Sequence, residues 1–293
     1  MTPDKDRSDF QPRLERAGRS TDAVPAPYDA IALDYADMEV VFKQWVIGPS
    51  LHAVLGDLKG EAAIDWACGS GEFSTLPLMA TCHAERVLGI DRSSEMIRQA
   101  RARSRKFPGV TYLVADAATM DVTGVEPVRV ASGVFLLNYA ADRAELTAMY
   151  STVAKCLVPG GRFVTVVPNP LAADVDTVQY GMCARTDRDA DGLPYDGAIR
   201  TATLFPAQRE PFSFTTYWYS ERTYIDAAET SGLRISRIVP CAPSGDALRQ
   251  FGDEFFRAYL VPQPQHLIFE FIKSQRDPGV GRPMDADSRG RAR

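Results

Sequence analysis

The sequence predicts an α/β fold in which helices cover a mostly parallel sheet. Three short apolar runs, each typical of a buried strand, lead to Asp65, Asp91 and Asp116, and helical patterns separate them. Because parallel strands present their carboxyl ends at one edge of a sheet, these carboxylates are expected together at the edge where such sheets bind ligands. The turn Ala67-Cys68-Gly69-Ser70-Gly71 follows the first run, and its glycines allow a ligand to approach the backbone closely.

Composition and charge limit the classes of partner. The chain has 293 residues, of which 45% are hydrophobic and 24% charged, as in ordinary globular proteins. A net charge of −5 argues against nucleic acid as the main partner, since phosphate binding needs a basic surface. The five cysteines are scattered, and no run reaches the roughly 18 apolar residues of a membrane helix. We therefore expect a cytoplasmic monomer or homodimer that acts on a small molecule, away from nucleic acid and membrane.

The N-terminal part has two predicted sections. Residues 1–25 are polar and contain prolines, which predicts a disordered tail. Residues 26–60 are predicted to be helical, with Tyr28 and Tyr35 on one helix and a break at Pro49. This helix either packs on the core or forms a lid whose tyrosines cover a ligand.

Residues 61–170 are predicted to form the ligand-binding core. Strands are expected at 62–65, 86–91, 110–114, 128–134 and 162–167, with helices between them. Asp91 lies about 20 residues after the glycine turn, the spacing at which a carboxylate accepts hydrogen bonds from a ribose diol. It could instead cap the helix that begins near Ser93.

The segment after Pro170 is too long for a simple connection, so residues 171–220 are predicted to be an insertion that caps the substrate. A helix is expected at 172–182, and the alternating runs 199–205 and 212–219 are expected to pair as a hairpin. Residues 221–273 are predicted to complete the core sheet with an antiparallel pair of strands at 233–239 and 266–272. A disordered tail is expected at 274–293.

Three stretches carry a resemblance to a known family. The run from Asp65 to Gly71 resembles motif I of the class I S-adenosylmethionine (SAM) dependent methyltransferases, although Ala67 stands where the family has its first glycine. The L-V-P-G-G-R-F-V run that begins at Leu157, preceded by L-L-N-Y-A from Leu136, looks like methyltransferases of bacterial natural-product biosynthesis, the toxoflavin N-methyltransferase group above all. The resemblance spans roughly 28–273 and implies a Rossmann-like sheet of seven strands with an antiparallel last strand.

The resemblance implies SAM as cofactor and S-adenosylhomocysteine as product. The glycine turn would contact the methionine part, Asp91 the ribose, and Asp116 with Ala117 the adenine. The full set of expected cofactor contacts is Tyr28, Tyr35, Asp65, Ala67, Cys68, Gly69, Gly71, Asp91, Arg92, Met96, Asp116, Ala117, Phe135 and Leu136.

The acceptor is expected to be a small planar or heteroaromatic natural product, because the lid and the insertion are rich in aromatic residues. The resemblance favours N-methylation over O- or C-methylation. The residues expected near the acceptor are Tyr28, Tyr139, Asn169, Tyr217 and Trp218. No residue stands out as a general base, so catalysis is expected to come from positioning.

Three other interpretations were weighed. A protein that binds SAM without catalysis, as a regulator, fits the same cofactor residues. A nicotinamide oxidoreductase is disfavoured because Ser74 stands where the dinucleotide fingerprint has its third glycine. Asp187, Asp189 and Asp191 match the opening of a calcium loop, but Ala198 stands where that loop needs its bidentate glutamate. We therefore expect a solvated acidic turn there and no metal.

Overall fold

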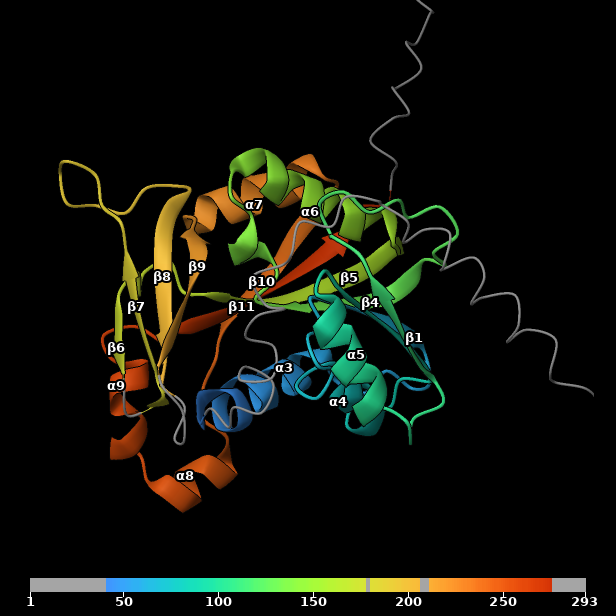
Figure 1. Cartoon of the computed structure of the whole chain (residues 1–293), viewed down its shortest axis with the longest axis horizontal. Coiled ribbons are helices and arrows are strands. Elements are labelled where there is room, and N and C mark those ends of the chain that lie inside the picture. Colours follow the sequence, from blue (N-terminus) through green and yellow to red (C-terminus); the bar gives the residue numbers. More distant parts are fainter. Residues whose placement is uncertain (1–40, 178–179, 206–210, 276–293) are drawn as a thin grey trace, which may run out of the picture.

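The computed structural model describes residues 41–177, 180–205 and 211–275. They form a seven-stranded sheet with helices on both faces and a separate four-stranded sheet beside it (Figure 1). The predicted lid tyrosines, Tyr28 and Tyr35, and the predicted tail at 1–25 lie outside the described residues, as does nearly all of the tail predicted at 274–293.

The large sheet has the strand order β10-β11-β5-β4-β1-β2-β3. Strand β11 runs antiparallel to both of its neighbours, β5 and β10, while the pairings among β1 to β5 are parallel. This confirms the predicted seven-stranded, mostly parallel sheet and its antiparallel strand. The strands are β1 Ala62–Trp66, β2 Arg86–Asp91, β3 Val110–Val114, β4 Val128–Val134, β5 Leu157–Pro168, β10 Leu233–Pro240 and β11 His266–Lys273.

Helices cover the two faces of this sheet. One face carries α3 (Gly48–Leu55), α4 (Thr75–Ala80) and α5 (Ser94–Arg103), and the opposite face carries α6 (Arg143–Lys155) and α7 (Glu221–Thr230) (Figure 1). The starts of α5, α6 and α7 follow from their N-caps, because each cap side chain accepts a hydrogen bond from the backbone N–H three residues later. The cap residues are Ser93, Asp142 and Ser220.

The helix before β1 differs from the prediction. Pro49 was expected to break it, but the π-helix η1 (Lys43–Ile47) continues directly into α3, so this prediction was wrong. Pro49 is the second residue of α3, and the carbonyl of Trp45, four residues earlier, accepts the Ser244 N–H at 2.9 Å in place of the N–H that proline lacks. None of the helices within the described residues has the length and apolar character that crossing a membrane requires.

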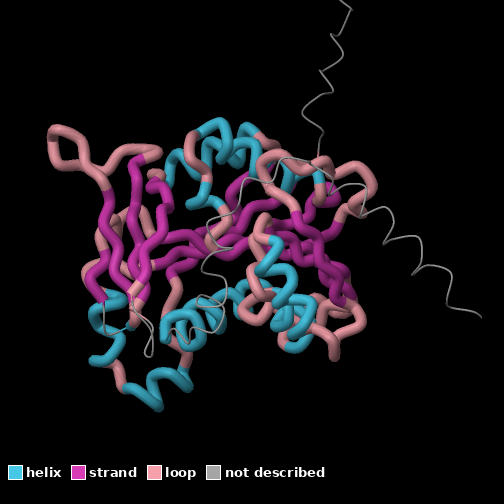
Figure 2. The backbone as a smooth tube through the Cα atoms, in the orientation of Figure 1, coloured by secondary structure: helices cyan, strands magenta, loops and turns pink. Residues whose placement is uncertain are grey.

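The smaller sheet is built from the predicted insertion. Its antiparallel strands run in the order β6-β7-β8-β9, and the β8–β9 pairing confirms the predicted hairpin. The prediction of a helix at 172–182 was wrong, because strand β6 lies there. Val175 and Thr177 are buried and Asp176 is exposed, which is the alternation of a strand. The strands are β6 Val175–Thr177, β7 Met182–Thr186, β8 Ala198–Leu204 and β9 Phe212–Trp218 (Figure 2).

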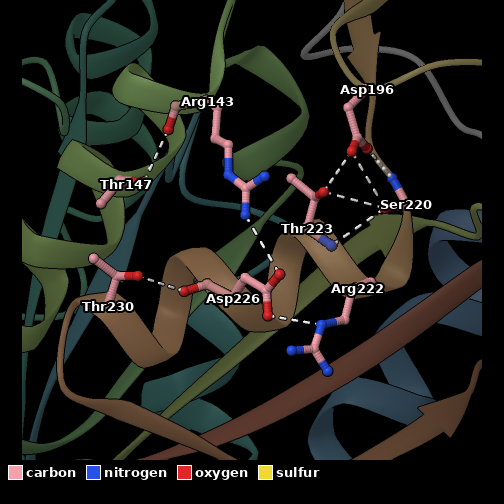
Figure 3. Close-up of polar contacts among 8 residues, drawn as sticks. All are labelled: Arg143, Thr147, Asp196, Ser220, Arg222, Thr223, Asp226 and Thr230. Carbon is pink, nitrogen blue, oxygen red and sulfur yellow. Dashed lines mark hydrogen bonds and ion pairs between the residues drawn. The ribbon is translucent and has the colours of Figure 1, made fainter.

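The insertion is fastened to the start of α7 by Asp196 (Figure 3). Its carboxylate accepts hydrogen bonds from the Ser220 backbone N–H at 2.7 Å and from the Thr223 hydroxyl at 2.5 Å. Further along α7, Asp226 pairs with Arg222 at 2.8 Å and with Arg143 of α6 at 3.4 Å. The loop before β8 is thereby joined to the pair of helices that covers the large sheet.

The C-terminal part closes back on the first described helix. Between β10 and β11 lie α8 (Gly245–Phe251), η4 (Glu254–Phe256) and α9 (Arg257–Leu260). On β11, Glu270 accepts hydrogen bonds from Arg162 of β5 at 3.0 Å and from Arg237 of β10 at 2.6 Å. Arg162 also donates to the carbonyl of Val54 at the end of α3. One carboxylate thus joins three strands and a helix.

Candidate functional site

The turn after β1 has the unusual backbone that its residues suggested. Ala67, Gly69 and Gly71 have φ angles of +54°, +54° and +77°. A Cβ added to Gly69 would meet no atom within 4 Å, so this part of the turn borders open space. A Cβ at Gly71 would lie 2.5 Å from the Tyr112 hydroxyl oxygen, so this glycine is needed for packing.

Asp65 lies behind the turn and is fully buried. Its carboxylate accepts hydrogen bonds from the hydroxyls of Ser74 and Thr75, both at 2.6 Å, and of Ser132 at 2.7 Å. Burial raises the pKa of Asp65 to about 6, and these three hydrogen bonds oppose the rise. Asp65 therefore joins β1 to β4 and to the start of α4.

Asp91, the last residue of β2, holds the turn from the other side. One carboxylate oxygen accepts the Gly69 N–H at 2.8 Å and the other accepts the Ser93 N–H at 2.8 Å. The helix cap of α5 is Ser93, so the interpretation of Asp91 as the N-cap was wrong. Asp91 therefore fixes the turn against the end of β2 and the start of α5.

A cavity of about 690 Å³, open to solvent, lies at the carboxyl ends of β1, β2, β3 and β4; we call it the sheet-edge cavity. It brings together most of the predicted cofactor residues, which come from four separate strand ends. Those that line it are Ala67, Gly69, Asp91, Arg92, Met96, Asp116, Ala117, Phe135 and Leu136.

Among the described residues, three that were predicted to contact the cofactor do not line this cavity. Asp65 and Gly71 support the turn as described, and Cys68 is buried with its Sγ 3.6 Å from the Gly69 carbonyl oxygen. The prediction also missed apolar lining residues. Trp66, Ile90 and Ala115 are chain neighbours of the three aspartates and could have been found from that position, whereas Val134 and Met149 come from β4 and α6.

A second cavity, of about 480 Å³, lies between the small sheet and the edge of the large one; we call it the inter-sheet cavity. Phe135 and Tyr139 line both cavities, so the two adjoin. Phe135 has a φ of +57°, which is rare for a residue with a side chain. The remaining lining residues are Phe42, Lys43, Asn138, Pro168, Met182, Ala184, Arg200, Ala202, Leu204, Phe214, Thr216 and His266.

Of the described residues that were predicted to lie near the methyl acceptor, only Tyr139 lines a cavity. Tyr139 lies between the cavities, with the Arg92 guanidinium 5.9 Å from its ring centroid. Asn169 is buried, and its amide donates to the Pro264 carbonyl at 2.6 Å and accepts the Leu171 N–H at 2.9 Å. Trp218 donates to the Pro170 carbonyl at 3.1 Å, and Tyr217 packs on the hydrophobic core. Neither Asn169, Tyr217 nor Trp218 lines either cavity.

His266 and Arg200 were missed in the sequence analysis. His266 is buried, and burial, with the nearby charge of Arg200, lowers its pKa to about 3, so it is neutral at physiological pH. Its Nδ1 lies 2.7 Å from the hydroxyl oxygen of Tyr259. The signal for Arg200 was its place in β8, where it alternates with exposed residues and so belongs to the apolar face.

A protein family and several known proteins are similar to this chain in sequence. The profile of the family described as "Methyltransferase domain" matches residues 63–161. An uncharacterized 37.1 kDa protein in a transposon of Streptomyces fradiae is 34% identical over 110 residues, and a trans-aconitate 2-methyltransferase of Acidovorax is 31% identical over 108 residues. These alignments cover 38% and 37% of this chain and 31% and 38% of the relatives, so the chain spans about a third of each.

A solved structure extends the likeness over most of the chain. The structure of an S-adenosylmethionine-dependent methyltransferase from Mesorhizobium loti covers 77% of this chain and 96% of its own, with a TM-score of 0.54 and 22% identity. At this identity the likeness shows the shared fold.

Proposed function

We propose that this chain, which contains a methyltransferase domain with the class I SAM-dependent fold, transfers a methyl group from SAM to a small-molecule acceptor. The observation that carries the proposal is the sheet-edge cavity, where the glycine turn, Asp91 and Asp116 come together at the ends of β1, β2 and β3. The trans-aconitate 2-methyltransferase among the relatives supports a small acceptor over a macromolecule.

The residues of the sheet-edge cavity fit SAM. The open space at Gly69 leaves room for the methionine part beside the backbone, and the Asp91 carboxylate, which lines the cavity, suits a ribose diol. Asp116 and Ala117 would meet the adenine, Asp116 through its carboxylate and Ala117 through its backbone N–H. Met96, Leu136 and Met149 supply apolar contacts that exclude water.

Positioning is the main contribution that we assign to the protein. When bound, SAM supplies a methyl group that its sulfonium already activates. Phe135 and Tyr139 border both cavities and would hold the acceptor in line with that group. His266, with a pKa of about 3, is too weak a base to remove a proton at neutral pH. The reacting atom should therefore carry a free lone pair before it binds.

These properties support a planar acceptor methylated at nitrogen. The rings of Phe42, Phe135 and Phe214 line the inter-sheet cavity and suit a flat molecule. A weakly basic heteroaromatic nitrogen has a free lone pair at neutral pH, so it needs no base to remove a proton. The resemblance to the toxoflavin group favours the same atom and a role in natural-product biosynthesis; O- and C-methylation are the alternatives.

Calorimetric titration tests the cofactor assignment. Wild type should bind SAM and S-adenosylhomocysteine but not NAD, and Asp91→Asn should weaken both adenosyl ligands by about 1–3 kcal/mol because the ribose loses charged acceptors. Asp121→Asn is the matched control, since Asp121 also accepts a backbone N–H two residues later, in an exposed turn outside both cavities. Binding of neither adenosyl ligand to wild type would refute the proposal.

A further inference from the structure

Arg200 places a charge on a face of the small sheet that has no other charged residue along β8. Buried residues alternate with more exposed ones along β8, and the buried set is Ala198, Arg200, Ala202 and Leu204. Arg200 is only 3% exposed, and it lines the inter-sheet cavity together with Ala202 and Leu204. Arginine is rarely buried to this degree unless it is paired.

The guanidinium of Arg200 has no such partner among the described residues. Its Nη1 is enclosed without a hydrogen bond, and no described carboxylate forms an ion pair with it. Asp174 acts on Arg200 only through space, because its oxygens are engaged by the Arg188 guanidinium and the Thr186 N–H, both at 2.9 Å. Burial lowers the pKa of Arg200 to about 10, which leaves the side chain charged at neutral pH.

The rest of the inter-sheet cavity favours an anion as well. Of its described lining residues none is Asp or Glu, and Lys43 is a second cation among them. The Tyr259 hydroxyl is buried and donates to Nδ1 of His266 if that nitrogen carries no proton. We therefore assign the ring proton of the neutral imidazole to Nε2, which makes His266 a hydrogen-bond donor. No described residue accepts a hydrogen bond from that Nε2–H.

We propose that Arg200 binds an acidic group, a carboxylate by its chemistry, on the methyl acceptor in the inter-sheet cavity. This inference rests on the proposed function and narrows its substrate class to planar acids. The guanidinium fork matches the two oxygens of a carboxylate, and the low-polarity surroundings strengthen the pairing. The acid is an anchor, because hydrogen bonds from a guanidinium reduce the nucleophilicity of the oxygens that they hold. The methylated atom then lies elsewhere on the acceptor.

Thermal unfolding with a matched pair of probes tests the inference. Benzoate and benzamide have nearly the same shape, but only benzoate is charged, so we expect saturating benzoate to raise the Tm of wild type by about 2–5 °C and benzamide to have little effect. Sodium chloride at the same ionic strength controls for screening. Equal responses to benzoate and benzamide would overturn the inference.

Variants separate a binding role from a structural one. In Arg200→Met the benzoate response should disappear, and the Tm without ligand should rise, because a buried unpaired charge is replaced by an apolar chain of similar length. Arg185→Met is the control: Arg185 lies on the neighbouring strand β7 but pairs with Asp176 at the surface, and its benzoate response should stay intact. A benzoate response in Arg200→Met equal to that of wild type would reject the assignment.

Two further measurements keep the outcomes distinct. Arg200→Lys keeps the charge but loses the two-pronged guanidinium, so it should bind benzoate at least about tenfold more weakly than wild type. This variant replaces Arg200→Met in the test if Arg200→Met does not fold. S-adenosylhomocysteine should raise the Tm of wild type and of all variants equally. If it stabilises none of them, the proposed function fails; if it stabilises all while benzoate acts like benzamide, only the Arg200 inference fails.

Discussion

Asp65 shows how a single carboxyl can be both a structural joint and a titrating group. It is fully buried, and three hydroxyls donate to it from α4 and β4. Burial favours the protonated form more strongly than these hydrogen bonds favour the charged one, so the pKa rises to about 6. The stability of the turn should therefore depend on pH.

The folded protein should lose stability from Asp65 as the pH rises from about 4 to about 7. In this range the folded state binds the Asp65 proton more tightly than the unfolded chain does, so the free energy of unfolding falls with rising pH. The rise of the pKa from 3.8 to about 6 corresponds to about 3 kcal/mol. Urea unfolding of wild type and Asp65→Asn across this range should show that difference between their curves.

An exposed carboxyl provides the control for this prediction. Asp121 accepts the Thr123 N–H, which lowers its pKa below 3.8, so any stability that it contributes is lost only at more acidic pH. Asp121→Asn should therefore run parallel to wild type between pH 4 and 7. Parallel curves for wild type and Asp65→Asn between pH 4 and 7 would contradict the assignment of the raised pKa to Asp65.

The sequence predicted those site residues that end or follow a recognisable strand. It did not predict those that reach a cavity only through the folding of segments far apart in the chain. Asp91 and Asp116 could be predicted because each closes a recognisable apolar run. Arg200 and His266 could not be assigned to a site, because the cavity that they share exists only when β8 and β11 lie beside the residues after β4. Asn169 was expected near the acceptor, but neighbouring backbone groups occupy its amide.

At the scale of elements, the insertion is a four-stranded sheet that is held to α7 by the hydrogen bonds of Asp196. The hairpin of β8 and β9 was predictable because both runs alternate, whereas β6 is three residues long and too short for a periodic signal. Asp196 sits just before β8 and holds the first turn of α7 through Ser220 and Thr223 (Figure 3).

Removing this joint should destabilise the insertion and the start of α7 together. Asp196→Ala leaves the Ser220 N–H and the Thr223 hydroxyl without their acceptor, and we expect the free energy of unfolding to fall by about 1–2 kcal/mol. Hydrogen exchange should quicken in the first turn of α7. Asp191→Ala is the control, since that exposed carboxylate accepts no hydrogen bond from a described residue; a loss equal to that of Asp196→Ala would contradict the prediction.

At the scale of the whole molecule, Glu270 joins parts that lie far apart in the sequence. Its side chain is 9% exposed and bonds Arg162 and Arg237, and Arg162 reaches the end of α3. The seven-stranded sheet itself could be predicted from its apolar runs. This ionic junction could not, because no local pattern relates a charge on β11 to a helix more than 200 residues earlier.

Glu270→Gln should therefore weaken the molecule as a unit. Two guanidinium groups lose their shared carboxylate, and because both are partly exposed we expect a loss of about 2–3 kcal/mol, below that of a wholly buried pair. Glu254→Gln, which breaks an exposed pair with Arg257, should cost under about 0.5 kcal/mol. Urea unfolding measures both, and equal losses would refute the special role of Glu270.

The small sheet lines the inter-sheet cavity but contributes no residue to the sheet-edge cavity, and this has an evolutionary consequence. Substitutions in β8 and β9 alter the inter-sheet cavity alone, whereas a change at Phe135 alters both cavities. A lineage can therefore diversify the insertion strand by strand while the glycine turn and its aspartates stay constant. Duplicated copies of such a gene can acquire new acceptors through a few exchanges in one hairpin, with the seven-stranded sheet inherited unchanged.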